Sequence, residues 1–417
     1  METGIGVEYP RWQKNNAEHA LKTRRVVLLS GPRQCGKTTL AKKLNFPEEI
    51  TYRTLDNENM RKSAILDPYG FLKHKANVFI IDEVQRAPEL LSAIKMIVDE
   101  DPRPGQFLLT GSANIQSLPT VYESLAGRIT KIRLRPLTQG EITFKTPRFF
   151  SYAFKQLFEY ESEYYDRDAV IDIAFRGGFP EAARLQGQDR ARWHKDYIEA
   201  ILDRDLHEIV HIQRRESMYD LVEIIAAWSS KLMDISGICS GLSIRRPTVE
   251  SYINALQALY VVDSVRPWIK TDYDRVGKQS KLFFADTGLM CSILNWSQDQ
   301  VRLDPDRVGK LIETLVYNEL SAQIDASNGE YRLYHYRDRT NREIDFLIER
   351  EDNAILGIEV KAGLNVNHKD FAHLQWFKDN LAKQKPFIGI VLYSGEFVLP
   401  FGPDMWAVPY GKIWPDN

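Results

Sequence analysis

The sequence is poor in cysteine. It has three among 417 residues, Cys35, Cys239 and Cys291, which lie far apart and form no CxxC pair. An odd number of isolated cysteines excludes a disulfide framework and a cysteine-rich metal cage, and it is typical of a reducing compartment. Residues 1–12 show no basic stretch followed by an apolar one, so we expect no secretory signal and a cytoplasmic location.

Long hydrophobic runs and a strong net charge are also missing. Apolar runs such as Val26–Leu29 and Val78–Ile81 suit buried strands and fall far short of the ~20 residues that span a bilayer. We therefore predict no membrane partner. A formal charge of -2 and a pI near 6.5 exclude a uniformly basic nucleic-acid coat but allow local basic patches. The length predicts two to four domains.

The first ~140 residues alternate short apolar runs with helical stretches, a pattern that predicts a mostly parallel α/β sheet with helices on both faces. Their near-continuous apolarity indicates strands buried on both sides. The predicted strands are Val26–Ser30, Thr51–Leu55, Val78–Asp82, Gln106–Thr110 and Ile129–Leu134. Beyond Pro136 the composition changes, and residues 145–170 are rich in Phe and Tyr.

Residues 31–38 match the phosphate-binding pattern GxxxxGK[ST] between a predicted strand and a predicted helix. Glycines let backbone N–H groups surround phosphate oxygens, and the helix N-terminus favours negative charge. Lys37 is expected to reach the β- and γ-phosphates of ATP, and Thr38 to bind Mg²⁺. The alternative is a chance match in a turn. The predicted contacts are Gly31, Pro32, Arg33, Gln34, Cys35, Gly36, Lys37, Thr38 and Thr39.

The predicted strand Val78–Asp82 ends in a carboxylate, and a second carboxylate, Glu83, follows directly. We predict that Asp82 holds Mg²⁺ and that Glu83 orients and deprotonates the attacking water. Alone, an apolar run that ends in Asp-Glu is a common strand terminus. About 45 residues after a phosphate-binding loop, it favours hydrolysis over binding alone.

The next predicted strand ends in small polar residues. Ser112 is the candidate sensor of the γ-phosphate, with Thr110 and Asn114 as alternatives and an ordinary turn as the competing interpretation. Arg128 is a candidate for stabilising the transition state, within the chain or across a subunit interface of a homo-oligomer. A lone arginine is also a common surface residue.

Between Met218 and Asp286 the pattern is typical of a winged helix-turn-helix. The expected helices are Tyr219–Trp228, Ile235–Ser240 and Pro247–Leu259, and the expected wing strands are Val261–Val265 and Lys281–Phe284. Arg245 and Arg246 lie where the third helix would meet a phosphate backbone. DNA contact and a lid or protein contact both remain open. Residues 207–211 spell HExxH, but polar neighbours and the lack of a third ligand favour coincidence over zinc.

A cluster of acidic residues marks the C-terminal part, which reads as a second α/β unit. Glu359 and Lys361 lie on one face of a predicted strand, and Asp345 lies in the strand before it. Glu313, on a predicted helix Gly309–Ser321, completes the set. Nucleases use Asp…Glu-x-Lys, because carboxylates hold Mg²⁺ and the lysine assists the nucleophile. We take all four residues as catalytic candidates, with Asp345 and Glu359 as metal ligands. The alternative is that Glu-x-Lys is an ordinary alternation of charges on an exposed strand face, without a catalytic role.

Predicted strands of this unit are Arg332–Tyr336, Ile344–Glu349, Ile355–Val360 and Phe387–Tyr393, with a helix at His373–Asn380. Together with residues 27–40, 79–85, 109–112, 125–128 and 281–289, the acidic cluster resembles a bacterial and archaeal family of AAA+-superfamily P-loop ATPases. The resemblance covers nearly the whole chain. It implies an ASCE/AAA+-like P-loop domain, a winged-helix segment and a C-terminal domain of the restriction-endonuclease, PD-(D/E)xK, fold.

The expected architecture is thus α/β in four parts. These are a P-loop ATPase domain at 1–145, a lid or helical connector at 146–215, a winged helix-turn-helix at 216–292 and a nuclease-like domain at 304–417. The leading hypothesis is an ATPase that couples its nucleotide state to DNA engagement or cleavage. The alternative is a nucleotide-switched regulatory or scaffold protein whose inactive nuclease-like domain binds nucleic acid or a protein.

Overall fold

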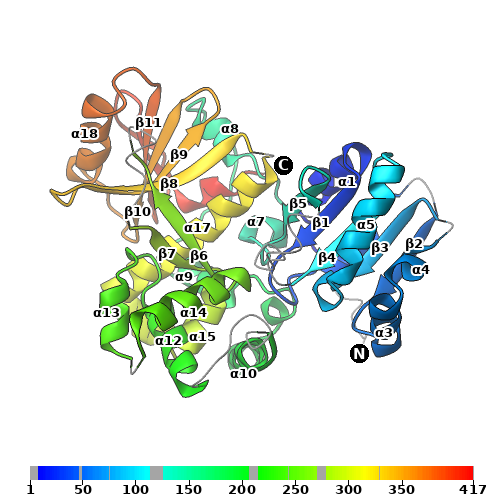
Figure 1. Cartoon of the computed structure of the whole chain (residues 1–417). Coiled ribbons are helices and arrows are strands. Elements are labelled where there is room, and N and C mark those ends of the chain that lie inside the picture. The colour runs from blue at the N-terminus through cyan, green and yellow to red at the C-terminus, as the bar shows by residue number, and fades with distance from the viewer. Residues whose placement is uncertain are drawn as a thin grey trace, which may run out of the picture.

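The computed structural model describes residues 8–46, 49–74, 76–112, 125–205, 215–242, 244–269, 279–327 and 329–416. It contains two sheets, which lie on opposite sides of the molecule (Figure 1). Among the described residues, no helix is long and apolar enough to cross a membrane.

The amino-terminal sheet has five parallel strands in the order β2-β3-β4-β1-β5. Strands β1, β3 and β4 are buried along their whole length, because hydrophobic clusters cover both faces of the sheet. The strands are β1 (Val26–Ser30), β2 (Ile50–Thr54), β3 (Val78–Asp82), β4 (Phe107–Gly111) and β5 (Ile129–Arg133). All five predicted strands are confirmed within a residue or so at each end.

Helices cover the two faces of this sheet from different parts of the sequence. One face carries α1 (Lys14–Thr23) and α2 (Lys37–Lys43). The other carries α3 (Glu58–Leu66), α4 (Pro68–Leu72) and α5 (Glu89–Glu100). Because every strand runs in the same direction, the residues that follow β1, β3 and β4 meet at one edge.

Helices dominate the middle of the chain. They are α7 (Gln139–Ile142), α8 (Phe149–Ala153), α9 (Arg167–Arg176), α10 (Gly187–Ala200), α12 (Arg215–Ala227), α13 (Ile235–Ser240), α14 (Arg246–Ala258), α15 (Thr287–Ile293), α16 (Gln298–Leu303) and α17 (Pro305–Ala326). The order α12-α13-α14 followed by the strands β6 (Val262–Pro267) and β7 (Lys281–Phe284) matches the predicted elements. Their assignment as a winged helix stays a prediction.

The second sheet is mixed and has the strand order β12-β13-β11-β10-β9-β8-β6-β7. Its further strands are β8 (Tyr331–Arg337), β9 (Glu343–Arg350), β10 (Ile355–Lys361), β11 (Phe387–Tyr393), β12 (Leu399–Gly402) and β13 (Met405–Pro409), with α18 (Ala372–Asn380) on one face. The predicted wing strands extend this sheet, since Arg266 and Pro267 of β6 pair with β8. The predicted segments 216–292 and 304–417 therefore share a sheet.

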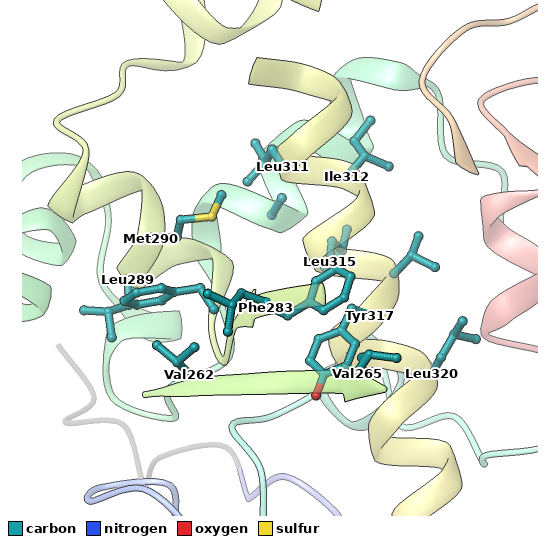
Figure 2. Close-up of a cluster of buried hydrophobic side chains, with 14 of the residues drawn as sticks. Val262, Val265, Phe283, Leu289, Met290, Leu311, Ile312, Leu315, Tyr317 and Leu320 are labelled. Carbon is teal, nitrogen blue, oxygen red and sulfur yellow. The ribbon is translucent and has the colours of Figure 1, made fainter. Parts of the chain in front are cut away.

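The segments 216–292 and 304–417 also share a hydrophobic core. Helix α17 packs its apolar side chains onto β6, β7 and α15, as Figure 2 shows for Phe283, Leu315 and Tyr317. The rings of Phe283 and Tyr317 stack with their centroids 4.2 Å apart. One hydrophobic cluster runs from Phe149 to Trp414 and joins the described parts of the connector, the helical middle and the C-terminal unit. The four-part division of the chain stays a prediction.

The aromatic segment after residue 145 packs mainly against the C-terminal unit. Phe149 and Phe150 are buried in the shared core. Tyr160 donates to the carbonyl of Lys412, and Tyr164 donates to the carbonyl of Ser394. This arrangement, which the sequence did not reveal, ties the connector to the second sheet.

Candidate functional site

The predicted phosphate-binding loop joins β1 to α2 in a shape that requires glycine. Gly31 has φ 157°, and a Cβ there would lie 2.0 Å from the carbonyl oxygen of Leu134. Gly36 has φ 98°, in the left-handed region that favours glycine. Both glycines of the motif are thus explained by backbone geometry, and the loop ends where α2 begins at Lys37.

Lys37 is buried, and its ammonium lies within the curve of the loop. Its Nζ donates to the carbonyl oxygens of Gly31 at 3.0 Å and Pro32 at 2.8 Å. A buried ammonium needs such partners because removing it from water is costly. The loop thus holds one positive charge at the carboxyl edge of the parallel sheet.

Asp82 is buried at the end of β3, where hydroxyl groups from three other elements converge on it. Its Oδ1 accepts from Thr38 at 2.8 Å and Thr110 at 2.6 Å, and its Oδ2 accepts from Tyr52 at 2.9 Å. Burial, reinforced by the charge of Asp82, raises the pKa of Tyr52 to about 12. The donor set at Asp82 and Thr38 consists of hard oxygens, which fit Mg²⁺.

Glu83 has an unusual backbone conformation and a tightly held side chain. Its φ of 59° places it in the left-handed region, and its N–H donates to Thr110 Oγ1 at 3.1 Å. Its Oε2 accepts from Ser112 Oγ at 2.9 Å and from the amide of Gln85. A strained backbone in a non-glycine residue is a feature of functional sites. Ser112 therefore contacts the candidate base, a partnership that its position in the sequence did not predict.

The loop opens into a cleft of about 1400 Å³. Lys37, Thr38 and Glu83 line it together with the segment before α1, including Tyr9. The rings of Tyr9 and Phe144 lie 6.5 Å apart at the cleft wall. The cleft is large enough for a nucleotide, since ligand pockets commonly have volumes of ~300–1,000 Å³.

Arg11 ties this segment to the loop. It donates to the carbonyl oxygens of Cys35 and Arg135, both at 2.6 Å, and pairs with Glu141 at 3.2 Å. Cys35 itself is buried, and its Sγ lies 3.5 Å from the carbonyl oxygen of Leu134. This position agrees with a space-filling role for the thiol.

Arg128 lies at the wrong edge of the sheet for catalysis within the same chain. Its carbonyl accepts from the N–H of Val26, the first residue of β1, whereas the loop follows the last residue of that strand. The guanidinium forms a bidentate pair with Asp99. Arg128 thus lies at the opposite end of β1 from the loop, which does not favour a role within the same chain. A role across a subunit interface stays a prediction.

The roles of the other residues singled out in the sequence stay predictions. Asn114 and the HExxH residues 207–211 lie outside the described residues. Arg245 and Arg246 are exposed at the start of α14, where Arg246 pairs with Glu250 at 2.8 Å. Their contact with DNA stays a prediction.

The predicted acidic residues of the C-terminal unit do come together. The antiparallel register of β9 and β10 pairs Phe346 with Ile358, which places Asp345 opposite Glu359 on the same face. Asp345 Oδ2 accepts from the N–H of Val360 at 2.9 Å. We call Glu313, Glu343, Asp345 and Glu359 the carboxylate cluster. Glu343 is a member that the sequence analysis did not name.

Lys281 of β7 enters the carboxylate cluster, a position that was not predicted from the sequence. Its side chain is 2% exposed, and its Nζ lies 2.6 Å from Glu313, 2.9 Å from Glu343 and 3.3 Å from Asp345. The predicted catalytic lysine, Lys361, is instead half-exposed and lies 3.8 Å from Asp370. A buried lysine in an apolar strand needs partners, which is the one signal that could have drawn attention to it.

Burial dominates the electrostatics of the cluster. It raises the pKa of Glu313 to about 8, against the opposing pull of Lys281. Burial and the neighbouring Asp345 raise the pKa of Glu359 well above its usual range. In the part of the chain that the structure describes, no group of three or more His, Cys, Asp or Glu is arranged to hold a metal ion. The predicted Mg²⁺ site at Asp345 and Glu359 thus does not fit this arrangement, in which the ammonium of Lys281 lies among the carboxylates.

Three successive parts of the chain match different protein families. Residues 23–143 match a family model described as an AAA domain. The amino-terminal part has an AAA-type P-loop fold. Residues 167–300 and 308–413 match two models described only as domains of unknown function, DUF8612 and DUF4143. The match to the AAA-type domain includes the loop, Asp82, Glu83 and Ser112.

Similar proteins occur in mycobacteria. An uncharacterized protein of Mycobacterium tuberculosis and one of Mycobacterium bovis are each 28% identical over 397 residues, which is 94% of this chain and 82% of theirs. Among solved structures, a Walker-type ATPase of Pyrococcus abyssi aligns with a TM-score of 0.40 and 15% identity, over 67% of this chain and 94% of that one.

The Holliday junction branch migration motor RuvB of Thermotoga maritima aligns with a TM-score of 0.26 and 19% identity, over 60% of this chain and 87% of that one. Both scores are low. The assignment of the AAA-type domain rests on the family model and on the sheet and loop geometry.

Proposed function

We propose that the AAA-type domain binds ATP with Mg²⁺ and hydrolyses it. The observation that carries this proposal is that Lys37, Thr38 and Glu83 line one cleft, with Asp82 hydrogen-bonded to Thr38 beside it. A phosphate-binding loop without a positioned carboxylate supports binding alone. Here a second carboxylate follows Asp82 directly and is oriented by Ser112 and Gln85.

Each residue has a role that follows from its position. The backbone N–H groups of the loop surround phosphate oxygens, and the ammonium of Lys37 turns from the carbonyls of Gly31 and Pro32 to the β- and γ-phosphates. Glu83 accepts the proton of the attacking water. Thr38 and Asp82 would hold Mg²⁺, which would supply neutralising charge at the phosphates. The rings of Tyr9 and Phe144 offer an apolar wall for the base.

Lys37→Ala tests the binding step. We expect loss of ATP binding in the presence of Mg²⁺, measured by calorimetry, and loss of phosphate release. Lys43→Ala is the matched control, because Lys43 lines the same cleft but its ammonium pairs with Glu8 at 2.6 Å near the surface. Normal ATP binding and turnover in Lys37→Ala would contradict the proposal.

We further propose that the nucleotide state is coupled to the C-terminal unit, which engages nucleic acid through its nuclease-like carboxylate cluster. The placement of Asp345 opposite Glu359, with Lys361 next on the same face, supports this second function. The alternative is a regulatory unit that binds nucleic acid or a protein without cutting. The buried position of Lys281 among the carboxylates favours an inactive ground state.

Plasmid DNA separates these two functions. Cleavage in the presence of ATP and Mg²⁺ or Mn²⁺, abolished by Asp345→Ala and by Lys361→Ala, would support a nuclease. Binding of DNA without cleavage, unchanged in both variants, would favour the regulatory alternative. Lys385→Ala is the matched control, because Lys385 belongs to the same unit but pairs with Glu349 of β9, away from the cluster.

A further inference from the structure

Lys281 and the carboxylate cluster form an internal ion group that crosses between segments. The lysine belongs to β7, whereas Glu313 belongs to α17 and Glu343 and Asp345 belong to β9. An ammonium has three N–H donors, and here three carboxylates lie 2.6, 2.9 and 3.3 Å from its nitrogen. Three carboxylates thus lie within ion-pair distance of the ammonium, and Asp345 Oδ1 accepts a hydrogen bond from it.

We infer that Lys281 is the built-in counter-ion of the carboxylate cluster, and that a divalent cation binds the cluster only when this ammonium leaves. Hard cations approach carboxylate oxygens to ~2.0–2.6 Å. A cation shared by Glu313 and Asp345 would therefore occupy the space that Nζ fills. The divalent cation and the ammonium of Lys281 would also repel each other strongly at such a distance in a buried site.

Glu359 is the member of the cluster for which the described ion pairs show no contact with Lys281. Glu359 is 8% exposed, and its Oε1 is buried without a hydrogen-bond partner among the described residues. It lies on the same face as Asp345, whose Oδ1 contacts Lys281. A buried, unpaired carboxylate oxygen beside other carboxylates is costly unless a cation or a proton accompanies it. Removing Lys281 would increase this cost.

The backbone of Lys281 is held by segments outside the cluster. In the described residues, β7 pairs with β6 and bridges to Leu232, and neither segment carries a cluster carboxylate. On β6, Asp263 accepts from Arg133 and Arg135, both at 2.8 Å. Arg133 is the last residue of β5 in the AAA-type domain, where it pairs with Ser30 just before the phosphate-binding loop, and Arg135 lies two residues further on.

This inference deepens the proposed function of the C-terminal unit and rests on it for its biological meaning. Its test uses Mn²⁺ alone, with full-length protein, no nucleotide and no DNA. A Lys281 variant that binds Mn²⁺ but does not cleave DNA would therefore contradict the nuclease proposal and still support the proposed role of Lys281.

The experiment compares Mn²⁺ binding by the wild type and Lys281→Met, using calorimetry and electron paramagnetic resonance. We expect Lys281→Met to gain a Mn²⁺ site at least ~10-fold tighter than any in the wild type. Adding Asp345→Asn should abolish that site. Lys385→Met, which removes a 2.7 Å ion pair to Glu349 elsewhere on β9, should gain none.

Two results obtained with folded protein would overturn the inference. One is a wild-type Mn²⁺ site of equal affinity that Asp345→Asn removes, since the ammonium would then exclude nothing. The other is a folded Lys281→Met that binds no Mn²⁺. Lys281→Gln is measured in parallel. If both variants fold only when Mn²⁺ is present, the inference is supported, whereas failure to fold even with Mn²⁺ contradicts it.

Discussion

The hydroxyl of Thr110 connects the two carboxylates of the nucleotide site. It donates to Asp82 Oδ1 at 2.6 Å and accepts from the N–H of Glu83 at 3.1 Å. The second contact fixes the left-handed backbone of Glu83, a conformation that costs ~1–2 kcal/mol in a residue other than glycine. Thr110 is thus a positioning residue.

Thr110→Val keeps the shape of the side chain and removes both hydrogen bonds. We expect kcat for ATP hydrolysis to fall by ~10–100-fold, the range typical of residues that orient catalytic groups, with a small change in KM. Thr110→Ser retains the hydroxyl and should restore most of the rate. Steady-state phosphate release measures both. Equal activity of the Val and Ser variants would contradict a positioning role.

At the residue scale, the sequence predicted groups that belong to linear motifs and missed those defined by distant partners. Lys37, Asp82 and Glu83 were found because strand, loop and helix signals surround them. Tyr52 and Gln85 were missed because they act through hydrogen bonds to Asp82 and Glu83. Lys281 was missed because its three partners lie on α17 and β9.

At the scale of elements, α17 connects most of the molecule. Tyr317 donates to Asp263 of β6 at 2.8 Å, and Asp325 accepts from Arg135 after β5 at 2.6 Å. Near its end, the carbonyl of Ala326 accepts from Asn16 of α1. The same helix carries Glu313 of the carboxylate cluster. One rigid element therefore touches both candidate sites.

Asp263→Asn tests this connection. The substitution leaves the guanidinium groups of Arg133 and Arg135 without their shared carboxylate in a buried position. Breaking a buried ion pair on one side typically costs ~3–5 kcal/mol, and we expect a loss of that size in the free energy of unfolding. Urea denaturation measures it. Asp299→Asn, whose side chain is 92% exposed, should change stability by less than ~0.5 kcal/mol.

The elements themselves were largely predictable, because apolar runs and helical spacing are local. The helix expected at Gly309–Ser321 extends to Pro305–Ala326, since Asp304 caps its start by accepting from two backbone N–H groups. Pairing across the chain was not predictable. Nothing local indicates that β6 joins β8, or that β12 and β13 complete the second sheet.

At the scale of the whole molecule, Glu319 of α17 joins parts that are far apart in the sequence. Its carboxylate accepts from the N–H of Gln139 and from the indole N–H of Trp414, both at 2.6 Å. Burial raises the pKa of Glu319 to about 7 from an ordinary value of 4.5. The folded protein therefore binds a proton here that the unfolded chain releases at lower pH.

This shift gives a pH dependence with a definite sign. The contribution of Glu319 to the free energy of unfolding is fully present below about pH 4.5 and is lost as the pH rises through about 7. Its size is about 3 kcal/mol for a shift of this extent. We expect wild-type stability to fall relative to Glu319→Gln, which stays neutral, between pH 5 and pH 8. Urea denaturation across this range measures the difference, and parallel pH profiles would contradict the prediction.

The central claim is that the AAA-type domain hydrolyses ATP with Glu83 as the base. The most direct measurement is ATP binding and phosphate release by Glu83→Gln beside Glu89→Gln, an exposed glutamate at the start of α5. The account predicts that Glu83→Gln binds ATP as the wild type does and loses ~10²–10⁴-fold in turnover, while Glu89→Gln stays active. Wild-type turnover in Glu83→Gln would contradict it.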